Sequence, residues 1–163
     1  MKIEEVDALE RAEFVAALGW VFESSSWVAV RGWKRRPFGS VEGLHAALVE
    51  EVAGATREEQ LALLRAHPDL GASARMSAAS VGEQAGAGLD RLPGAEFERL
   101  RDLNLAYRTK FGFPFLFAVK GSTLRDILDA LTRRSDRTPE EEFQEALEQV
   151  YRIARVRLEE AVS

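Results

Sequence analysis

Apolar residues recur three and four positions apart along most of the chain, which is the spacing of one face of an α-helix. The clearest case is a predicted helix over residues 96–111, whose apolar face consists of Phe97, Leu100, Leu103, Tyr107 and Phe111. A shorter helix is expected over residues 8–18, with a core face made of Ala12, Val15, Ala16 and Leu18. No stretch keeps the alternation of apolar and polar residues that is typical of a half-buried strand. The pattern therefore predicts an all-α protein.

Helix boundaries are marked by residues that cap helix ends. The predicted N-caps are Ser40, Thr56, Ser122 and Thr138. The second and the last of these have a glutamate three residues later, which is the spacing of a capping box, and Pro139 suits a first helical position. Gly19 and Gly112 are predicted helix ends. Because no linker or repeat interrupts the chain, we expect a single compact domain over residues 1–163 with about seven to eight helices.

The apolar run from Phe113 to Val119 is predicted not to be helical. Pro114 cannot continue a regular helix, because its ring removes the main-chain N–H and clashes with the preceding turn. The run is also too apolar to be exposed to water. We expect it to form a buried wall of extended or irregular structure.

His67 is expected at a fixed corner of the chain. The preceding helix must end there, because Pro68 disfavours the helical conformation of the residue before it and has no N–H to donate. Ser80 and Glu83 then open another helix, whose positive end offers unpaired N–H groups. The imidazole of His67, the carboxylate of Glu83 and the amide of Gln84 could therefore surround a small polar molecule.

The same residues also have an ordinary structural explanation. Ser80 and Glu83 have the spacing of a capping box, so both can serve only to start their helix. Pro68 can be helix punctuation, and His67 can interact only with the last carbonyl groups of the helix before it. Spacing alone leaves the catalytic and the structural explanation open.

Composition argues against several classes of function. With 22 Lys and Arg against 27 Asp and Glu, the net charge is -5, so no basic surface is expected for a phosphate backbone and nucleic acid is not an expected partner. The chain has no cysteine and only two histidines, His45 and His67, without the spacing of metal ligands. We expect no disulfide, no thiolate nucleophile and no bound metal, and we expect His45 to be half-buried or at the surface.

Membrane and targeting signals are also absent from the sequence. The first residues are acidic and lack the apolar core of a signal peptide. The longest apolar run, from Phe113 to Val119, is far shorter than the roughly 20 residues that a membrane span needs. We therefore expect a cytoplasmic protein without a membrane partner.

Three motifs in a fixed order carry a resemblance to a known family. They are the run from His67 to Gly71, the run from Ser80 to Leu89 with Glu83-Gln84 inside it, and the run from Leu103 to Phe115 that ends in Phe-Gly-Phe-Pro-Phe. This ordered set resembles the family of 2-oxo-4-hydroxy-4-carboxy-5-ureidoimidazoline (OHCU) decarboxylases, enzymes of uric acid breakdown. The similarity extends over most of the chain.

The resemblance implies an all-helical, cofactor-free homodimer that acts on a small-molecule ureidoimidazoline, just after the hydrolase that opens 5-hydroxyisourate. The family's active-site histidine falls on His67. Its substrate contacts fall on Pro68, Ser80, Val81, Gly82, Glu83, Gln84, Phe115, Leu116, Phe117, Ala118 and Val119. The chain departs from the family at Lys120, where relatives often have Arg, and at Asp136, where Asn is expected.

The chemistry of the implied reaction fits a protein without a cofactor. Loss of carbon dioxide leaves an electron pair that needs a sink, which many decarboxylases supply with a bound cofactor. The family's substrate carries its own sink, because its carboxylate carbon is next to a ring C=N that accepts the pair as the C–C bond breaks. The protein then has to hold the carboxylate out of the ring plane and to manage protons.

These tasks suggest a role for each residue that the resemblance marks. We expect His67 to be the general acid/base, since the ordinary pKa of histidine, about 6.5, lets it exchange protons near neutrality. Glu83 would accept or hold the C4 hydroxyl proton, and Gln84 would bond the ring or ureido edges. N–H groups of residues 80–82 would receive a carbonyl or carboxylate oxygen. Residues 115–119 would form a dry wall that also offers main-chain groups to the ureido arm.

Two other functions remain open from the sequence. The chain could be a non-catalytic α-helical interaction module whose aromatic run, with Trp20, Trp27 and Trp33, forms a groove for a partner. It could also decarboxylate a related ureido or imidazoline substrate. Turnover of freshly generated OHCU distinguishes these interpretations.

Overall fold

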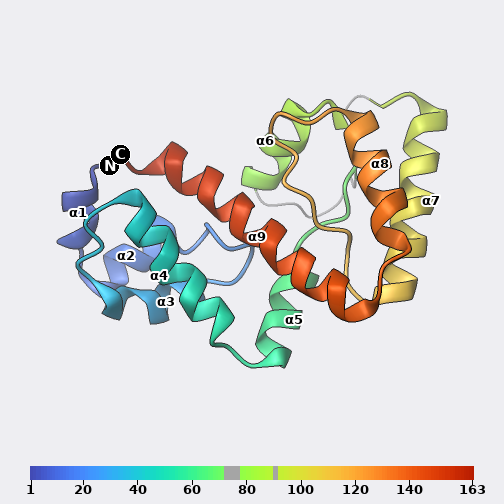
Figure 1. Cartoon of the computed structure of the whole chain (residues 1–163). Helices are drawn as coiled ribbons and strands as arrows, with labels where there is room; N and C mark the ends of the chain where they lie inside the picture. Colours follow the sequence, from blue (N-terminus) through green and yellow to red (C-terminus); the bar gives the residue numbers. More distant parts are fainter. Residues whose placement is uncertain (72–77, 90–91) are drawn as a thin grey trace. The chain divides into compact units, whose positions relative to one another are not determined.

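Helices make up the regular structure of the chain. The computed structural model describes residues 1–71, 78–89 and 92–163, and these residues contain helices and no strands, which confirms the all-α class (Figure 1). Nine α-helices occur in the described residues, and all except α1 and α3 have eight residues or more. No helix in these ranges has the length and apolarity needed to cross a membrane.

The chain divides into two compact units by its internal contacts. Unit 1 comprises residues 1–66 and 151–163, and unit 2 comprises residues 67–150. The last helix, α9 (Pro139–Ala161), contributes residues to both. The expected single domain over residues 1–163 stays a prediction.

Unit 1 consists of short helices and the end of α9. Its other elements are α1 (Ile3–Asp7), α2 (Arg11–Leu18), α3 (Trp27–Gly32), the 3-10 turn η1 (Trp33–Arg35), α4 (Val41–Ala53) and α5 (Arg57–Arg65). α3 packs against both α2 and α4. The buried core of this unit includes Phe14, Leu18, Leu44, Leu48 and Leu64.

The predicted helix over residues 8–18 is wrong in its start and in its core face. Its helical residues begin at Arg11, because the Glu13 carboxylate accepts a hydrogen bond from the Glu10 N–H at 3.2 Å and so caps α2 there. Phe14 and Leu18 are buried, whereas the predicted core residues Ala12 and Ala16 are exposed. The large aromatic ring, rather than the small alanines, sets the face of this helix that is buried.

The predicted starts of α4 and α5 are confirmed. Ser40 Oγ accepts a hydrogen bond from the Gly43 N–H at 2.9 Å, and Thr56 and Glu59 form the reciprocal pair of a capping box. The buried face of α4 consists of Leu44, Ala47, Leu48 and Val52, which have the three- and four-residue spacing of a helical stripe. α5 ends at Arg65, so His67 follows the helix after a single intervening residue.

The tryptophans of the interaction-module interpretation are engaged individually. Trp33 donates from its indole nitrogen to the Leu9 carbonyl at 2.9 Å, and the Arg36 guanidinium lies 4.0 Å from its ring centroid. Arg31 covers Trp27 at 4.6 Å, whereas Trp20 is 42% exposed. Cationic side chains therefore cover one ring face of Trp27 and one of Trp33.

Unit 2 consists of three further helices and the first half of α9. They are α6 (Ala78–Gly86), α7 (Gly94–Phe111) and α8 (Leu124–Ser135), and α7 packs against α8 (Figure 1). Gly112 ends α7 with a φ of 80°, a left-handed conformation that glycine adopts without strain, so the predicted end is confirmed. α8 is capped by Thr123 rather than by the predicted Ser122, because Asp126 completes a capping box with the threonine.

The buried face of α7 differs from the predicted one at its start. Leu100 and Tyr107 are buried as expected, but Phe97 is 38% exposed. Asn104 is buried in the middle of this face, at 2% exposure. A polar residue on the apolar side of a helix needs hydrogen-bond partners inside the protein, and one partner of Asn104 is the Leu70 carbonyl.

The run from Phe113 to Val119 is an irregular buried wall, as predicted. It contains no regular secondary structure, and Phe113, Phe115 and Leu116 are almost fully buried. Tyr107 of α7 meets the Phe115 ring edge-on at a centroid distance of 5.3 Å. Aromatic packing from α7 therefore fixes the side chains of this wall.

Candidate active site

The predicted site residues come from three segments of unit 2. They belong to the turn after His67, to helix α6 and to the wall that follows α7. All of these segments lie within residues 67–150. The site can therefore be described within one compact unit.

The turn after His67 is anchored to α7 by two side chains. Asn104 donates from Nδ2 to the Leu70 carbonyl at 2.9 Å, and Arg108 donates from Nη2 to the Asp69 carboxylate at 3.0 Å. His67 itself is buried, at 5% exposure. The anchors act two and three residues beyond His67, so they restrict where the imidazole can lie.

A third anchor joins the same turn to α6. The main-chain N–H of Gly71 donates to Gln84 Oε1 at 2.8 Å, and Gln84 is 5% exposed. Gly71 has a φ of 79°, and a Cβ at this position would lie 3.0 Å from Leu100 Cδ2. Only glycine combines this backbone conformation with so close an approach to α7. Two of the three motifs that were separate in the sequence are thus in direct contact.

Helix α6 begins earlier than predicted. It starts at Ala78, so Ser80 is its third residue rather than its first. The predicted main-chain donor roles of Ser80, Val81 and Gly82 stay predictions. Alanine favours helix strongly enough to extend it before the first capping signal. The small and polar residues of the run 71–79 predict a loop, and most of this run lies outside the described residues.

Exposure along α6 separates the predicted residues into two groups. Ser80 and Gln84, one helical turn apart, are both 5% exposed, and Glu83 beside them is half-buried. Val81 is 47% exposed, and Gly82 is exposed as well. The buried side of α6 therefore carries the serine, the amide and part of the carboxylate. Pro68, in the neighbouring turn, is half-buried.

The wall has its main chain held by side chains from α8 and α9. The Leu116 carbonyl accepts a hydrogen bond from Arg134 Nη1 at 2.7 Å, and the Ala118 N–H donates to Gln149 Oε1 at 2.9 Å. Phe117 and Ala118 are half-buried, and Val119 is 5% exposed. Two main-chain groups that were expected to serve a ligand are therefore already bound by the protein.

Arg134 belongs to a buried polar network that the sequence interpretation missed. Its Nε lies 2.7 Å from Glu142 Oε1, and both side chains are at most 1% exposed. The Tyr107 hydroxyl donates to the same carboxylate oxygen. Burial, together with this hydrogen bond, raises the pKa of Tyr107 above its ordinary value. Arg137 adds an ion pair at 3.3 Å to the other oxygen of Glu142.

The charged run over residues 133–137 predicts a basic link between two helices, and this prediction is wrong for Arg134. The residue lies in the last turn of α8, three positions after Leu131 and seven after Ile127. That spacing continues the apolar stripe of the helix and was the available signal for burial. The charged neighbours of Arg134 made this spacing hard to recognise in the sequence.

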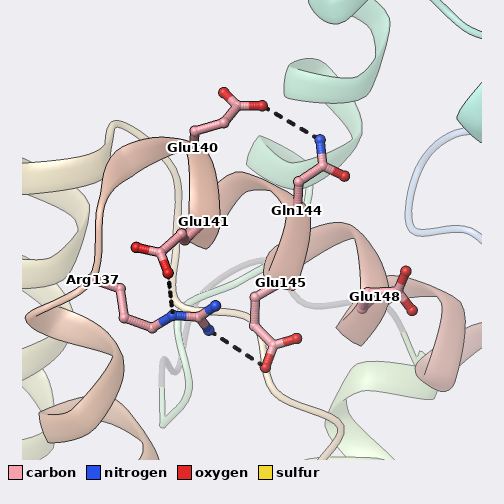
Figure 2. A pocket seen from close by; sticks show the side chains of 6 residues that line it. All are labelled: Arg137, Glu140, Glu141, Gln144, Glu145 and Glu148. Carbon is pink, nitrogen blue, oxygen red and sulfur yellow. Dashed lines mark hydrogen bonds and ion pairs between the residues drawn. The ribbon is translucent and has the colours of Figure 1, made fainter.

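A shallow hollow of about 420 Å³ lies over the first turns of α9 and is distinct from the predicted site (Figure 2). It is lined by Arg137, Glu140, Glu141, Gln144, Glu145 and Glu148. Figure 2 shows Arg137 between two of the carboxylates, with ion pairs of 3.8 Å to Glu141 and 3.9 Å to Glu145. In the part of the chain that the structure describes, no three His, Cys, Asp or Glu side chains are arranged to hold a metal ion. The hollow is a solvated charged surface.

Comparisons with known proteins agree over the whole chain. The family model for OHCU decarboxylase matches residues 7–159. The 2-oxo-4-hydroxy-4-carboxy-5-ureidoimidazoline decarboxylase of Halalkalicoccus jeotgali is 47% identical over 160 residues, which cover 98% of this chain and 91% of that protein. A crystal structure of (S)-allantoin synthase matches with a TM-score of 0.82 at 34% identity and covers all of this chain, which spans 54% of that one. A crystal structure of OHCU decarboxylase in the presence of (S)-allantoin has the same fold, with a TM-score of 0.72 at 22% identity over 93% of this chain and 97% of that one.

Proposed function

The chain belongs to the OHCU decarboxylase family and is a decarboxylating lyase of uric acid degradation, and we propose that it converts OHCU to (S)-allantoin without a cofactor. One observation carries the proposal. The match to the family spans residues 7–159, and within this span Gln84 contacts the turn that holds His67. Two of the three resemblance motifs therefore contribute to one place in unit 2.

His67 acts as the general acid/base in this proposal. The reaction breaks the bond between the ring carbon and the carboxylate, carbon dioxide leaves, and the electron pair flows into the adjacent ring C=N. A proton is then delivered to one face of the resulting enol. Support comes from the burial of His67 and from the anchors at Asp69, Leu70 and Gly71, because a proton donor must be held within hydrogen-bond reach of the reacting atom.

The buried side of α6 receives the polar edge of the substrate. Glu83 holds the C4 hydroxyl or accepts its proton, and the amide nitrogen of Gln84 donates to the ring or ureido oxygens. The N–H of Ser80, near the positive end of α6, receives a carboxylate or carbonyl oxygen. Val81 and Gly82, on the exposed side of α6, offer their main-chain N–H groups to the same oxygen.

The wall over residues 115–119 receives the ureido arm. Leu116 and Ala118 are held by protein side chains, so Phe117 between them is assigned the main-chain contact with the arm. The rings of Phe115 and Phe117 are stacked, with centroids 6.0 Å apart. The stacking places the side chains of Phe115 and Phe117 on one side of the wall, as in an extended backbone, where successive residues direct their main-chain groups to opposite sides. This arrangement supports the assignment to Phe117.

The proposal extends to assembly and location. We assign the protein to a homodimer, as the resemblance implies, and to the cytoplasm. Light scattering on the protein as it elutes from a size-exclusion column should give about twice the chain mass of 18.1 kDa. A mass equal to one chain contradicts the dimer and leaves the reaction unaffected.

The reaction is tested with substrate generated in place, by oxidising urate and hydrolysing the product. The chain should speed the disappearance of OHCU and yield optically active (S)-allantoin, whereas boiled protein should leave the slow, racemic background. An interaction module would leave both the rate and the racemic outcome unchanged. A relative with a changed substrate would fail on OHCU but accelerate the decarboxylation of a related ureidoimidazoline.

A further inference from the structure

We propose that Gln149 and Arg134 are positioning residues for the reaction, because they hold the main chain of the wall on either side of Phe117. This inference rests on the proposed function. It assigns a role in substrate binding to two buried side chains that lie outside the resemblance motifs, one on α9 and one on α8. Neither is assigned a contact with the substrate.

Gln149 is the simpler of the two. Its side chain is 4% exposed, and Oε1 lies 2.9 Å from the Ala118 nitrogen. A buried amide destabilises a protein unless its polar atoms are bonded, so an apolar residue would be the ordinary choice at such a position. The hydrogen bond to the Ala118 N–H indicates that this buried amide holds the main chain of the irregular wall.

Arg134 holds the preceding part of the wall in two ways. Nη1 donates to the Leu116 carbonyl at 2.7 Å, and the guanidinium carbon lies 4.5 Å from the centroid of the Phe115 ring. The planar guanidinium can do both at once because its donors and its face point in different directions. The Glu142 carboxylate accepts a hydrogen bond from Arg134 Nε and so holds the guanidinium in this position.

The two contacts satisfy groups that a helix or strand would otherwise pair. Buried main-chain N–H and C=O groups need partners, and an irregular segment must find them in side chains. The Leu116 carbonyl and the Ala118 N–H are two residues apart, so the position of Phe117 is fixed from both sides. Loss of either contact should displace the main chain that receives the ureido arm.

The experiment on Gln149 compares four variants of the intact chain. Gln149→Met removes the acceptor and keeps the length, and Gln149→Asn keeps an amide that is too short to reach Ala118. Gln149→Glu keeps an acceptor oxygen at the same reach. Gln144→Met is the matched control, since Gln144 is an exposed glutamine on the same helix. Each variant is measured for KM, for kcat and for the thermal midpoint, and (S)-allantoin is titrated as a binding probe.

The expected result is a change in binding more than in turnover. Gln149→Met and Gln149→Asn should raise KM about tenfold, which is the equivalent of one lost hydrogen bond. They should weaken the binding of (S)-allantoin by a similar factor. Their kcat should stay within about threefold of wild type, because the proton-transfer groups are untouched. Gln149→Glu should recover most of the affinity, and Gln144→Met should behave as wild type.

For Arg134, the double variant Arg134→Met with Glu142→Gln removes both members of the buried ion pair and avoids an uncompensated buried charge. It should raise KM as Gln149→Met does. Wild-type KM and (S)-allantoin affinity in Gln149→Met and Gln149→Asn would overturn the inference while the proposed reaction stands. A wild-type chain that does not turn over OHCU overturns both. If Gln149→Met does not fold, the shorter amide in Gln149→Asn decides.

Discussion

Gln84 on α6 accepts a hydrogen bond from the main-chain N–H of Gly71 at 2.8 Å, four residues after His67. This contact joins a turn and a helix that lie 13 positions apart in the sequence. It also uses the acceptor oxygen of the amide, which leaves the amide nitrogen as the group that can donate to a substrate. Gln84 therefore combines a structural role with the proposed binding role, and the two can be separated by mutation.

Replacement of Gln84 should separate these roles. Gln84→Leu removes the acceptor for a buried N–H and should lower the free energy of unfolding by about 1–3 kcal/mol, together with the activity. Gln84→Glu keeps an acceptor for Gly71 but has no amide donors, so it should retain more of the stability and still lose turnover. Chemical denaturation and steady-state kinetics measure the two effects. Equal activity in wild type and Gln84→Glu would show that the amide nitrogen does not contact the substrate.

His67→Ala should abolish most of the turnover while leaving the fold intact. Loss of a general acid/base lowers kcat by about 10²–10⁴-fold. Circular dichroism should show unchanged helix content, because the turn is held by residues 69–71. The matched control is His45→Ala, since His45 is the other histidine of the chain and contacts the Tyr151 carbonyl in unit 1. Wild-type kcat in the His67 variant would remove it from the mechanism.

Glu83→Gln should lower kcat by about 10²-fold, because the neutral amide cannot take the proton of the C4 hydroxyl. The side chain keeps its size, so the thermal midpoint should change little. Glu98→Gln, on the exposed side of α7, is the control for a change of one charge. A kcat that falls equally in both variants would point to net charge instead of a specific role for Glu83.

Tyr107 should remain protonated where an ordinary tyrosine ionises. Burial and the bond to Glu142 raise the pKa of Tyr107 in the folded state. Its contribution to stability is therefore complete below the unfolded pKa of about 10 and is lost as the pH rises above that value. Ultraviolet titration of the folded protein should be the same for wild type and Tyr107→Phe up to about pH 11. In denaturant the wild type should show one more phenolate, and a difference between the folded proteins would contradict the prediction.

Glu59 should make unit 1 sensitive to acid. The Arg31 side chain and the Thr56 N–H lower the pKa of Glu59 to about 2. Its contribution to stability is present above the unfolded pKa of about 4.3 and is lost as the pH falls toward 2. Denaturation at a series of pH values should show that the free energy of unfolding falls less steeply in Glu59→Gln than in wild type over this interval. Glu58→Gln, which changes the exposed neighbour, should follow the wild-type curve.

The sequence determined the helical class and several helix boundaries. Ser40, Thr56 and Thr138 start helices as predicted, and Gly112 ends one, because caps satisfy unpaired main-chain groups within a few residues of where they stand. The wall from Phe113 to Val119 could be predicted for a similar reason. A proline and a run of apolar residues are local facts, and they exclude both a regular helix and an exposed loop.

The roles of the polar residues were decided by tertiary structure. Arg134 and Gln149 are buried because α8 and α9 bring them to the main chain of the wall, and Gln84 is occupied because α6 lies against the turn at Gly71. The sequence around a charged or amide side chain is the same whether its hydrogen-bonding groups are bound by water or by a distant main-chain group. Caps and apolar periodicity act over a few residues and can be predicted from the sequence, whereas the partner of a buried polar group is chosen by packing between segments far apart in the chain.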